Sequence, residues 1–136
     1  MTKLICALCV IFSISCLSLP SYSQVPVEYT YPLSNAKGVS EKTSIGIRYG
    51  EPLISSLIQT GTFTINGSST GIHTAKIALS VDGRTVIFTV DNFFESEENI
   101  QINIAPFVCT SGKETMPYSL SFQIAKIGMP SIPIPV

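Results

Sequence analysis

The sequence has little that would support metal or nucleic-acid chemistry. It contains no tryptophan, the strongest residue for stacking on sugars, and a single histidine, His73. One histidine cannot form the histidine clusters that hold metal ions, nor supply a second imidazole for catalysis. Only 12% of the 136 residues are charged, and the formal net charge is −1. A chain without a basic face is not expected to bind the phosphates of nucleic acids.

Three of the four cysteines lie in an N-terminal segment with the layout of a secretory signal peptide. Lys3 precedes an apolar run over residues 4–19, and Ser21 and Ser23 supply the small residues that precede a cleavage site. The run is shorter and richer in serine than a transmembrane span, which needs about 20 apolar residues. We therefore expect cleavage after Ser23 and a protein that is secreted or held at the cell surface.

Two other interpretations of residues 1–23 remain open. An uncleaved signal would act as a membrane anchor, whereas lipidation of Cys16 would make the chain a lipoprotein. Ser13 stands three residues before Cys16, where bacterial lipoprotein signals usually carry leucine. After residue 23 no segment of the sequence approaches a membrane span.

Removal of residues 1–23 leaves 113 residues and a single cysteine, Cys109. One cysteine excludes an internal disulfide, so the domain must be stabilised by its hydrophobic core, for which this length is sufficient. Two interpretations of Cys109 remain: a buried, inert thiol, or a disulfide between two chains in an oxidising compartment. Nothing adjacent in the sequence offers a base or cation that would activate its thiolate.

The rest of the chain is dominated by alternation of apolar and polar residues, which is typical of half-buried strands. Shorter β-rich segments at 27–31 and 62–65 bring the expected strands to about seven, which predicts an all-β fold, a two-sheet antiparallel β-sandwich. The low charge leaves the strand edges poorly guarded by charged side chains. The alternating residues expected to face the core are Ile45, Ile47, Tyr49, Ile77, Leu79, Val81, Val86, Phe88, Val90, Ile100, Ile102, Ile104, Leu120, Phe122 and Ile124.

Turn residues separate these segments. Asp82-Gly83 predicts a two-residue hairpin turn, in which both central residues adopt positive φ. Residues 34–38 and 66–71 have loop composition, and the formal glycosylation sequon at Asn66 is interpreted as part of a turn. Residues 53–58 fit one helical turn better than a short edge strand.

Several short motifs follow one another in a recognisable order. A proline and turn at 32–38 precede the strand and proline of residues 43–52, and the hairpin DGRTVIF follows at 82–88. Phe94 with residues 97–104, and the turn at 111–113 with the strand at 118–124, complete the series. Over residues 26–126 this order resembles that of bacterial Ig-like domains of the SbsA type, named for modules in a surface-layer protein. The family usually carries Phe where Tyr49 stands here.

The resemblance implies an Ig-like β-sandwich over residues 24–126 and a non-catalytic function. Such domains act as spacers or adhesive units of secreted or cell-surface bacterial proteins, often ahead of other domains. The proline-rich segment 127–136 is interpreted either as a disordered tail or as a linker. A linker would make this chain the N-terminal part of a longer protein.

No group of residues suggests catalysis. The sequence lacks the Gly-x-Ser-x-Gly elbow, so a Ser-His-Asp triad around His73 has no presented nucleophile. His73 itself is expected at the surface or at a strand end. The acidic stretch 91–98 contains oxygen ligands of the kind Ca²⁺ prefers, but its spacing matches no calcium loop, and a solvated turn is expected. We therefore predict no catalytic, cofactor-binding or metal-binding residues, and no cofactor.

The sequence thus predicts a non-enzymatic structural spacer or adhesive module. The alternative is a module that binds an unidentified protein or glycan at the cell surface through loops at one end of the sandwich. An enzyme is the least favoured class because no catalytic constellation is present.

Overall fold

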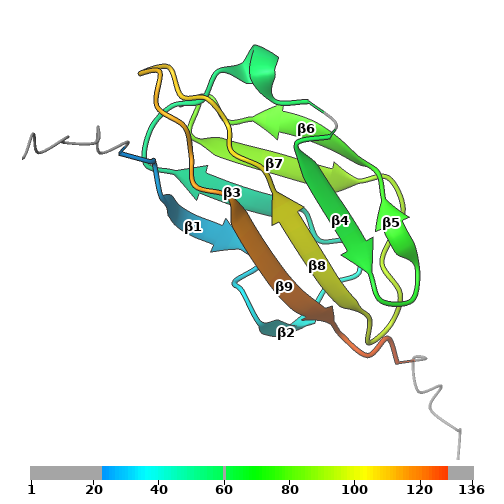
Figure 1. Cartoon of the computed structure of the whole chain (residues 1–136). Coiled ribbons are helices and arrows are strands. Elements are labelled where there is room, and N and C mark those ends of the chain that lie inside the picture. The colour runs from blue at the N-terminus through cyan, green and yellow to red at the C-terminus, as the bar shows by residue number, and fades with distance from the viewer. Residues whose placement is uncertain (1–22, 60, 129–136) are drawn as a thin grey trace, which may run out of the picture.

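The computed structural model describes residues 23–59 and 61–128, and they form a sandwich of two β-sheets (Figure 1). The predicted all-β sandwich is confirmed. The predicted signal peptide and proline-rich tail lie outside the described residues, apart from Ser23, Ile127 and Gly128. The elements are β1 (Val27–Tyr31), β2 (Ala36–Val39), β3 (Ile45–Tyr49), the 3-10 helix η1 (Ser55–Leu57), β4 (Phe63–Gly67), β5 (Gly71–His73), β6 (Ala75–Leu79), β7 (Thr85–Val90), β8 (Asn99–Ile104) and β9 (Tyr118–Ile124).

One sheet has the strand order β1-β3-β7-β6 and the other β2-β9-β8-β4-β5. All neighbouring strands are antiparallel except β2 and β9, which are parallel. The chain crosses between the sheets repeatedly: it first crosses after the cis peptide bond between Tyr31 and Pro32, returns to form β3, and later crosses back at Thr74, between β5 and β6. The order β1-β3-β7-β6 corresponds to the A-B-E-D sheet of an immunoglobulin sandwich, and the order β9-β8-β4 corresponds to its G-F-C sheet. This correspondence confirms the Ig-like class.

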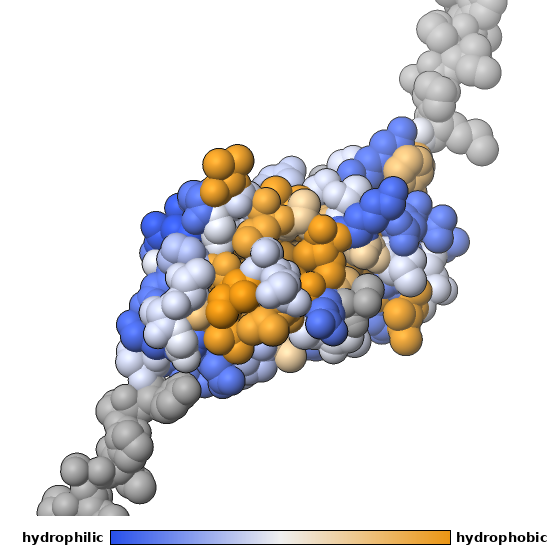
Figure 2. Space-filling view, turned by 90° about the horizontal axis from the view of Figure 1, so that it is seen from above, coloured by the Kyte–Doolittle hydropathy of each residue, from blue (hydrophilic) through white to orange (hydrophobic). Residues whose placement is uncertain are grey.

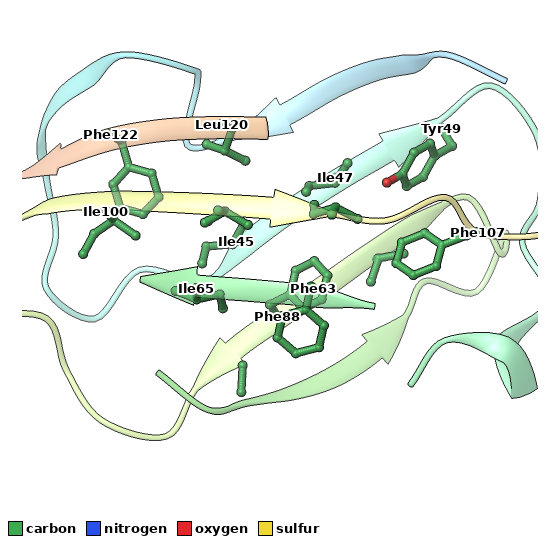
Figure 3. Packing of buried hydrophobic residues seen from close by; sticks show 14 of the residues in the cluster. Ile45, Ile47, Tyr49, Phe63, Ile65, Phe88, Ile100, Phe107, Leu120 and Phe122 are labelled. Carbon is green, nitrogen blue, oxygen red and sulfur yellow. The ribbon is translucent and has the colours of Figure 1, made fainter. Parts of the chain in front are cut away.

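The core lies between the sheets and is built from the inward faces of alternating strands (Figure 3). Because side chains alternate across a strand, Ile45, Ile47 and Tyr49 of β3 are all fully buried. Phe63 of β4 meets Phe88 of β7 across the sheets, with ring centroids 4.5 Å apart. Each buried aliphatic or aromatic side chain contributes about 1.5–3 kcal/mol, so the core stabilises the domain without a disulfide.

Two of the nine strands were not expected from the sequence, since β2 and β5 lie in segments with loop composition. The β2 strand is four residues long and pairs with β9, and the positive φ of Asn35 and Gly38 lets the chain bend at both of its ends. The expected turn at Asn66-Gly67 is also wrong. Both residues belong to β4, which pairs with β5 through Asn66 and Ile72, so the turn falls at residues 68–70.

The Asp82-Gly83 hairpin is present, but its turn is not the expected two-residue type. Only Gly83 has a positive φ, 69°, and its N–H donates to the carbonyl oxygen of Ser80 at 2.9 Å. The Asp82 carboxylate accepts hydrogen bonds from the Ser80 hydroxyl and the Arg84 N–H, which stabilises a wider loop. Val81, predicted to face the core, lies in this loop and is exposed.

The strand edges, which the sequence predicts to be poorly guarded by charge, are guarded mainly by geometry. A register shift interrupts β1 between Val27 and Tyr29, and β5 is only three residues long. The edge strands β2 and β6 each carry one exposed lysine, Lys37 and Lys76. Bulges, short strands and lysines all hinder pairing with another chain.

Residues 53–58 contain a helical turn, as the sequence predicts, because the 3-10 helix η1 occupies residues 55–57.

Candidate functional site

The sequence predicts that His73 lies at the surface or at a strand end. It is the last residue of β5, and its side chain is buried, with 9% exposed. Its ring lies against Phe94, with centroids 4.7 Å apart, and its Nε2 is hydrogen-bonded to the hydroxyl of Thr70. The Thr70 hydroxyl donates its only hydrogen to Oε1 of Glu98 at 2.7 Å. Nε2 of His73 must therefore be the donor toward Thr70, which fixes the histidine tautomer.

Glu98 is the centre of this cluster and is only 1% exposed. Its Oε1 also accepts the backbone N–H groups of Ser69 and Thr70 at 2.9 and 2.7 Å, and its Oε2 accepts that of Glu95 at 2.9 Å. Burial alone raises the pKa of Glu98, but these hydrogen bonds outweigh it and hold the pKa at about 2. The ionised side chain thus joins the β4–β5 turn to the connection between β7 and β8.

The cluster does not have the geometry of a catalytic triad. In a triad the imidazole lies between the nucleophile and the carboxylate. Here the Thr70 hydroxyl lies between His73 and Glu98, and its proton is held by the carboxylate. The main surface depressions of the described residues are lined by other side chains. We assign the cluster a structural role.

Glu98 was missed by the sequence reasoning, which treated residues 91–98 as one solvated turn. A signal was present, because Glu98 continues the inward alternation of Ile100, Ile102 and Ile104 back by one step. Asp91, in contrast, is exposed and accepts a hydrogen bond from the Thr74 hydroxyl at 2.6 Å. Within residues 23–59 and 61–128, no group of three His, Cys, Asp or Glu side chains is placed to hold a metal ion.

Cys109 is fully buried and unpaired within the described chain, which agrees with the inert-thiol interpretation. Burial raises the pKa of its thiol, and the neighbouring carboxylate of Glu51 raises it further. A thiol in this state is a poor nucleophile.

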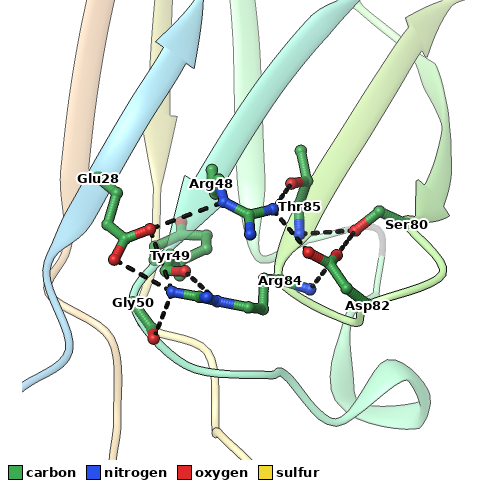
Figure 4. Close-up of polar contacts among 8 residues, drawn as sticks. All are labelled: Glu28, Arg48, Tyr49, Gly50, Ser80, Asp82, Arg84 and Thr85. Atoms are coloured by element: carbon green, nitrogen blue, oxygen red, sulfur yellow. Dashed lines mark hydrogen bonds and ion pairs between the residues drawn. The ribbon is translucent and has the colours of Figure 1, made fainter.

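A network of ion pairs covers the outer face of the four-stranded sheet near one end (Figure 4). Arg48 lies 2.8 Å from Asp82 and 3.6 Å from Glu28, and Arg84 lies 3.1 Å from Glu28. Hydrogen bonds from Ser80 and Arg48 hold the pKa of Asp82 at about 2. Acids and bases alternate in this network, so it offers no patch of one charge to a ligand.

The outer face of the five-stranded sheet is different, because β4, β5, β8 and β9 contain no Asp, Glu, Lys or Arg. Their outward positions carry amides and hydroxyls in cross-strand rows. Only Ile72, at the β5 edge, is a large exposed apolar side chain on these positions. The polar residues of this face, named here the amide face, are Thr64, Asn66, Asn99, Gln101, Asn103, Ser119, Ser121 and Gln123.

Two open depressions lie on the amide face. The larger has a volume of about 500 Å³ and is lined by Thr64, Asn103 and Ser119 together with Pro117 and Tyr118. The smaller, of about 130 Å³, lies toward β2, where Lys37 stands at its rim. The lack of charged residues in these strands is visible in the sequence. The sequence does not show that the strands lie side by side and form one face of a sheet.

Apolar side chains are exposed at both margins where the two sheets part. Figure 2, viewed from the side on which β6 and η1 lie in Figure 1, shows an apolar patch there. Along the other margin an open groove of about 400 Å³ follows β1 and β2, with Tyr29, Tyr31 and Leu33 exposed. The partly exposed apolar residues of η1, its flanks and β6 are Ile54, Leu57, Ile58, Ile77 and Leu79.

No helix within the described ranges is long and apolar enough to span a membrane. Comparison with curated protein sequences finds no match. Among solved structures, the surface-layer protein SbsC (domains 1–6) is similar, with a TM-score of 0.59 and 18% identity. The similarity covers 78% of this chain but only 14% of that SbsC chain.

Two further solved structures have the same fold. The copper resistance protein PcoC from Escherichia coli aligns with a TM-score of 0.58 and 12% identity, over 72% of this chain and 97% of PcoC. An L,D-transpeptidase from Mycobacterium smegmatis aligns with a TM-score of 0.53 and 17% identity, over 76% of this chain and 41% of the enzyme. At these identities the similarity concerns the fold alone.

The family comparison covers most of the sandwich. The model of the family described as bacterial Ig-like domain matches residues 23–123. This range contains β1 to β8 and nearly all of β9. The chain therefore belongs to the bacterial Ig-like domain family.

Proposed function

We propose that this chain is a non-catalytic spacer module of a secreted or cell-surface bacterial protein. Membership of the bacterial Ig-like family supports the proposal, as does similarity to part of the surface-layer protein SbsC. The signal peptide predicted for residues 1–23 belongs to the same proposal. Mass spectrometry of the secreted protein should find a chain that begins at Gln24, whereas a lipidated Cys16 would place it in a membrane.

The observation that carries the spacer role is that the chain enters and leaves the sandwich at opposite ends (Figure 1). At the entry, Val25 forms a β-bridge with Thr115, in the connection between β8 and β9. At the exit, the Ile127 N–H donates to the Ser96 hydroxyl at 2.8 Å, in the connection between β7 and β8. A module with its ends at opposite poles separates its neighbours by its full length.

The pairing of β2 with β9, two strands near opposite ends of the chain, supports a module that resists tension along this axis. The parallel strands β2 and β9 pair through Ala36 with Phe122 and through Val39 with Ile124. Two backbone hydrogen bonds flank the pairing, from Asn35 to Ser121 at 2.6 Å and from Ala125 to Val39 at 2.8 Å. When the chain ends are pulled apart, β2 and β9 slide in opposite directions, so these bonds are loaded together rather than one at a time.

Single-molecule force spectroscopy on the mature chain tests the proposal. Handles attached through cysteines at Gln24 and Gly128 load the chain from pole to pole. Handles at Gln24 and Thr110 load two points near the same pole. Gln24 adjoins Val25, which forms a bridge with Thr115, and Thr110 adjoins Cys109, which forms a bridge with Leu53. Thr115 and Cys109 both lie in the connection between β8 and β9. We expect a clearly higher unfolding force in the pole-to-pole geometry. An equal or lower force would contradict a tension-bearing spacer.

The adhesive or loop-binding alternative has less support than the spacer role. The loops at both ends of the sandwich adjoin the points at which the chain enters and leaves. In a spacer these poles face the neighbouring domains, whereas the outer faces of the two sheets stay open to a partner.

A further inference from the structure

We propose that the amide face of the five-stranded sheet binds an uncharged glycan chain. This binding function goes beyond the spacer role and does not depend on it. The proposal rests on three features of the face: its hydrogen-bonding groups, the regular arrangement of those groups, and the absence of charge.

The hydrogen-bonding groups match those of a sugar. Each asparagine or glutamine amide offers both donors and an acceptor, and sugar hydroxyls likewise donate and accept. The side chains of Thr64, Asn66, Asn99 and Gln101 make no hydrogen bond to the rest of the described chain. Ser119 donates to Oδ1 of Asn103 at 2.7 Å, which orients that amide so that its NH₂ group is turned away from Ser119.

These groups form a regular array. One cross-strand row runs from Asn66 through Gln101 to Ser121, and the next runs from Thr64 through Asn103 to Ser119. Neighbouring strands are about 4.8 Å apart, and outward residues on one strand repeat after about 6.6 Å. A chain molecule with repeating hydroxyl groups can therefore meet several of these side chains at once, which an isolated small ligand cannot.

The absence of charge selects among partners. A nucleic acid needs Lys or Arg against its phosphates, and β4, β5, β8 and β9 carry none. A protein interface usually has a buried centre rich in aromatic residues or Arg, whereas the one large apolar side chain exposed on these strands is Ile72, at the β5 edge. An uncharged glycan needs neither, and it binds here without the cost of desolvating a charged side chain.

The larger depression supplies an apolar contact beside the amides. The exposed Pro117, just before β9, lines it together with Thr64, Asn103 and Ser119. Tyr118 follows the inward alternation of Leu120 and packs against the core, so its ring is not part of the amide face. We infer that one end of the glycan rests on Pro117 and that the glycan chain continues across β8.

NMR titration of the ¹⁵N-labelled mature chain tests the proposal. The probes are two uncharged glycans, the N-acetylglucosamine hexamer and cellohexaose, and one acidic glycan, trigalacturonate. We expect saturable shifts with at least one uncharged glycan, confined to amides of β4, β8 and β9, and weaker shifts with trigalacturonate. No shifts with either uncharged glycan at millimolar concentration, or shifts centred on the loops, would overturn the proposal.

A pair of surface variants locates the binding. Gln101→Glu keeps the shape of the side chain but replaces a donor with a negative charge, and should weaken binding about fivefold or more. Thr89→Glu, which adds the same negative charge on the outer face of the other sheet, is the matched control and should leave the affinity unchanged. Equal affinity of wild type and Gln101→Glu would contradict the site. Shifts on this face that grow with protein concentration alone would show that a second copy occupies it, which also overturns the proposal.

Discussion

A Cβ atom placed on Gly67 would lie 2.1 Å from Oε1 of Glu98, far inside van der Waals contact. The same atom would lie 2.5 Å from the hydroxyl oxygen of Thr70. Gly67 has no positive φ, so its backbone would accept any residue, and only the space is missing. The buried carboxylate and the glycine are therefore a matched pair: the carboxylate can reach its donors because residue 67 has no side chain.

Gly67→Ala should destabilise the domain because the methyl group must displace the carboxylate or the Thr70 hydroxyl. We expect a loss of about 1–3 kcal/mol in the free energy of unfolding, the usual cost of overpacking. Urea denaturation measures it. Gly46→Ala in β3 is the matched control, since its new Cβ would meet nothing nearer than 4.0 Å. A loss as large in the control would show that the clash at Glu98 is not the cause.

Glu98→Gln should destabilise the domain at neutral pH and much less in acid. The variant removes the charge that accepts four hydrogen bonds, and we expect a loss of about 2–4 kcal/mol at pH 7. The pKa of Glu98 is lowered from 4.5 to about 2, so folding favours the ionised form. Its contribution, about 3 kcal/mol, is complete above pH 4.5 and is lost as the pH falls toward 2.

The measurement is urea denaturation of both proteins between pH 7 and pH 2. The difference in unfolding free energy between wild type and Glu98→Gln should narrow over the acid end of this range. Asp82→Asn provides a comparison, because the pKa of Asp82 is also about 2 but its carboxylate is exposed to solvent. A difference for Glu98→Gln that stays constant with pH would contradict the role of the buried charge.

Tyr49→Phe should leave the stability unchanged or raise it by up to about 1 kcal/mol. The buried Tyr49 hydroxyl forms no hydrogen bond in the described structure. The Thr115 hydroxyl, which accepts the Phe107 N–H at 2.8 Å, lies near enough to lower the pKa of Tyr49 against the larger effect of burial. Burial raises the pKa of Tyr49 well above its usual value, as expected for a phenol cut off from water. Calorimetry should show a melting temperature equal to or above that of wild type. A clear decrease would mean that the hydroxyl has a partner.

The parts of the fold that follow from side-chain alternation were predictable from the sequence. A sandwich core requires only that every second residue of a strand be apolar, and β3, β7, β8 and β9 obey this rule. The strands β2 and β5 obey no such rule. They are short, mostly exposed, and exist because β9 and β4 offer them backbone partners. Their formation depends on tertiary pairing, which a local pattern does not contain.

The candidate sites were predictable only in part, for a related reason. The alternation of β8 separates Glu98 from Glu97, but three of the hydrogen bonds to its carboxylate come from the distant turn that contains Ser69 and Thr70, which no local pattern contains. The lack of charge in β4, β8 and β9 is visible in the sequence, but the rows of the amide face exist only once the register is known. The residue content of each strand can be seen in the sequence, whereas the arrangement of side chains into rows depends on the fold.

Cys109 should be unreactive in the folded protein and reactive once the chain unfolds. Its side chain is fully buried, and burial together with the nearby carboxylate of Glu51 raises the pKa of its thiol, so little thiolate is present at neutral pH. Reaction with Ellman's reagent should be slower by about a hundredfold or more in buffer than in guanidinium chloride, because the native thiol reacts only through transient opening. Non-reducing electrophoresis of the mature chain should show one monomeric band. A disulfide-linked dimer in the native protein would contradict the assignment, since two buried sulfur atoms could meet only if the end of the sandwich around Leu53 and Cys109 opened.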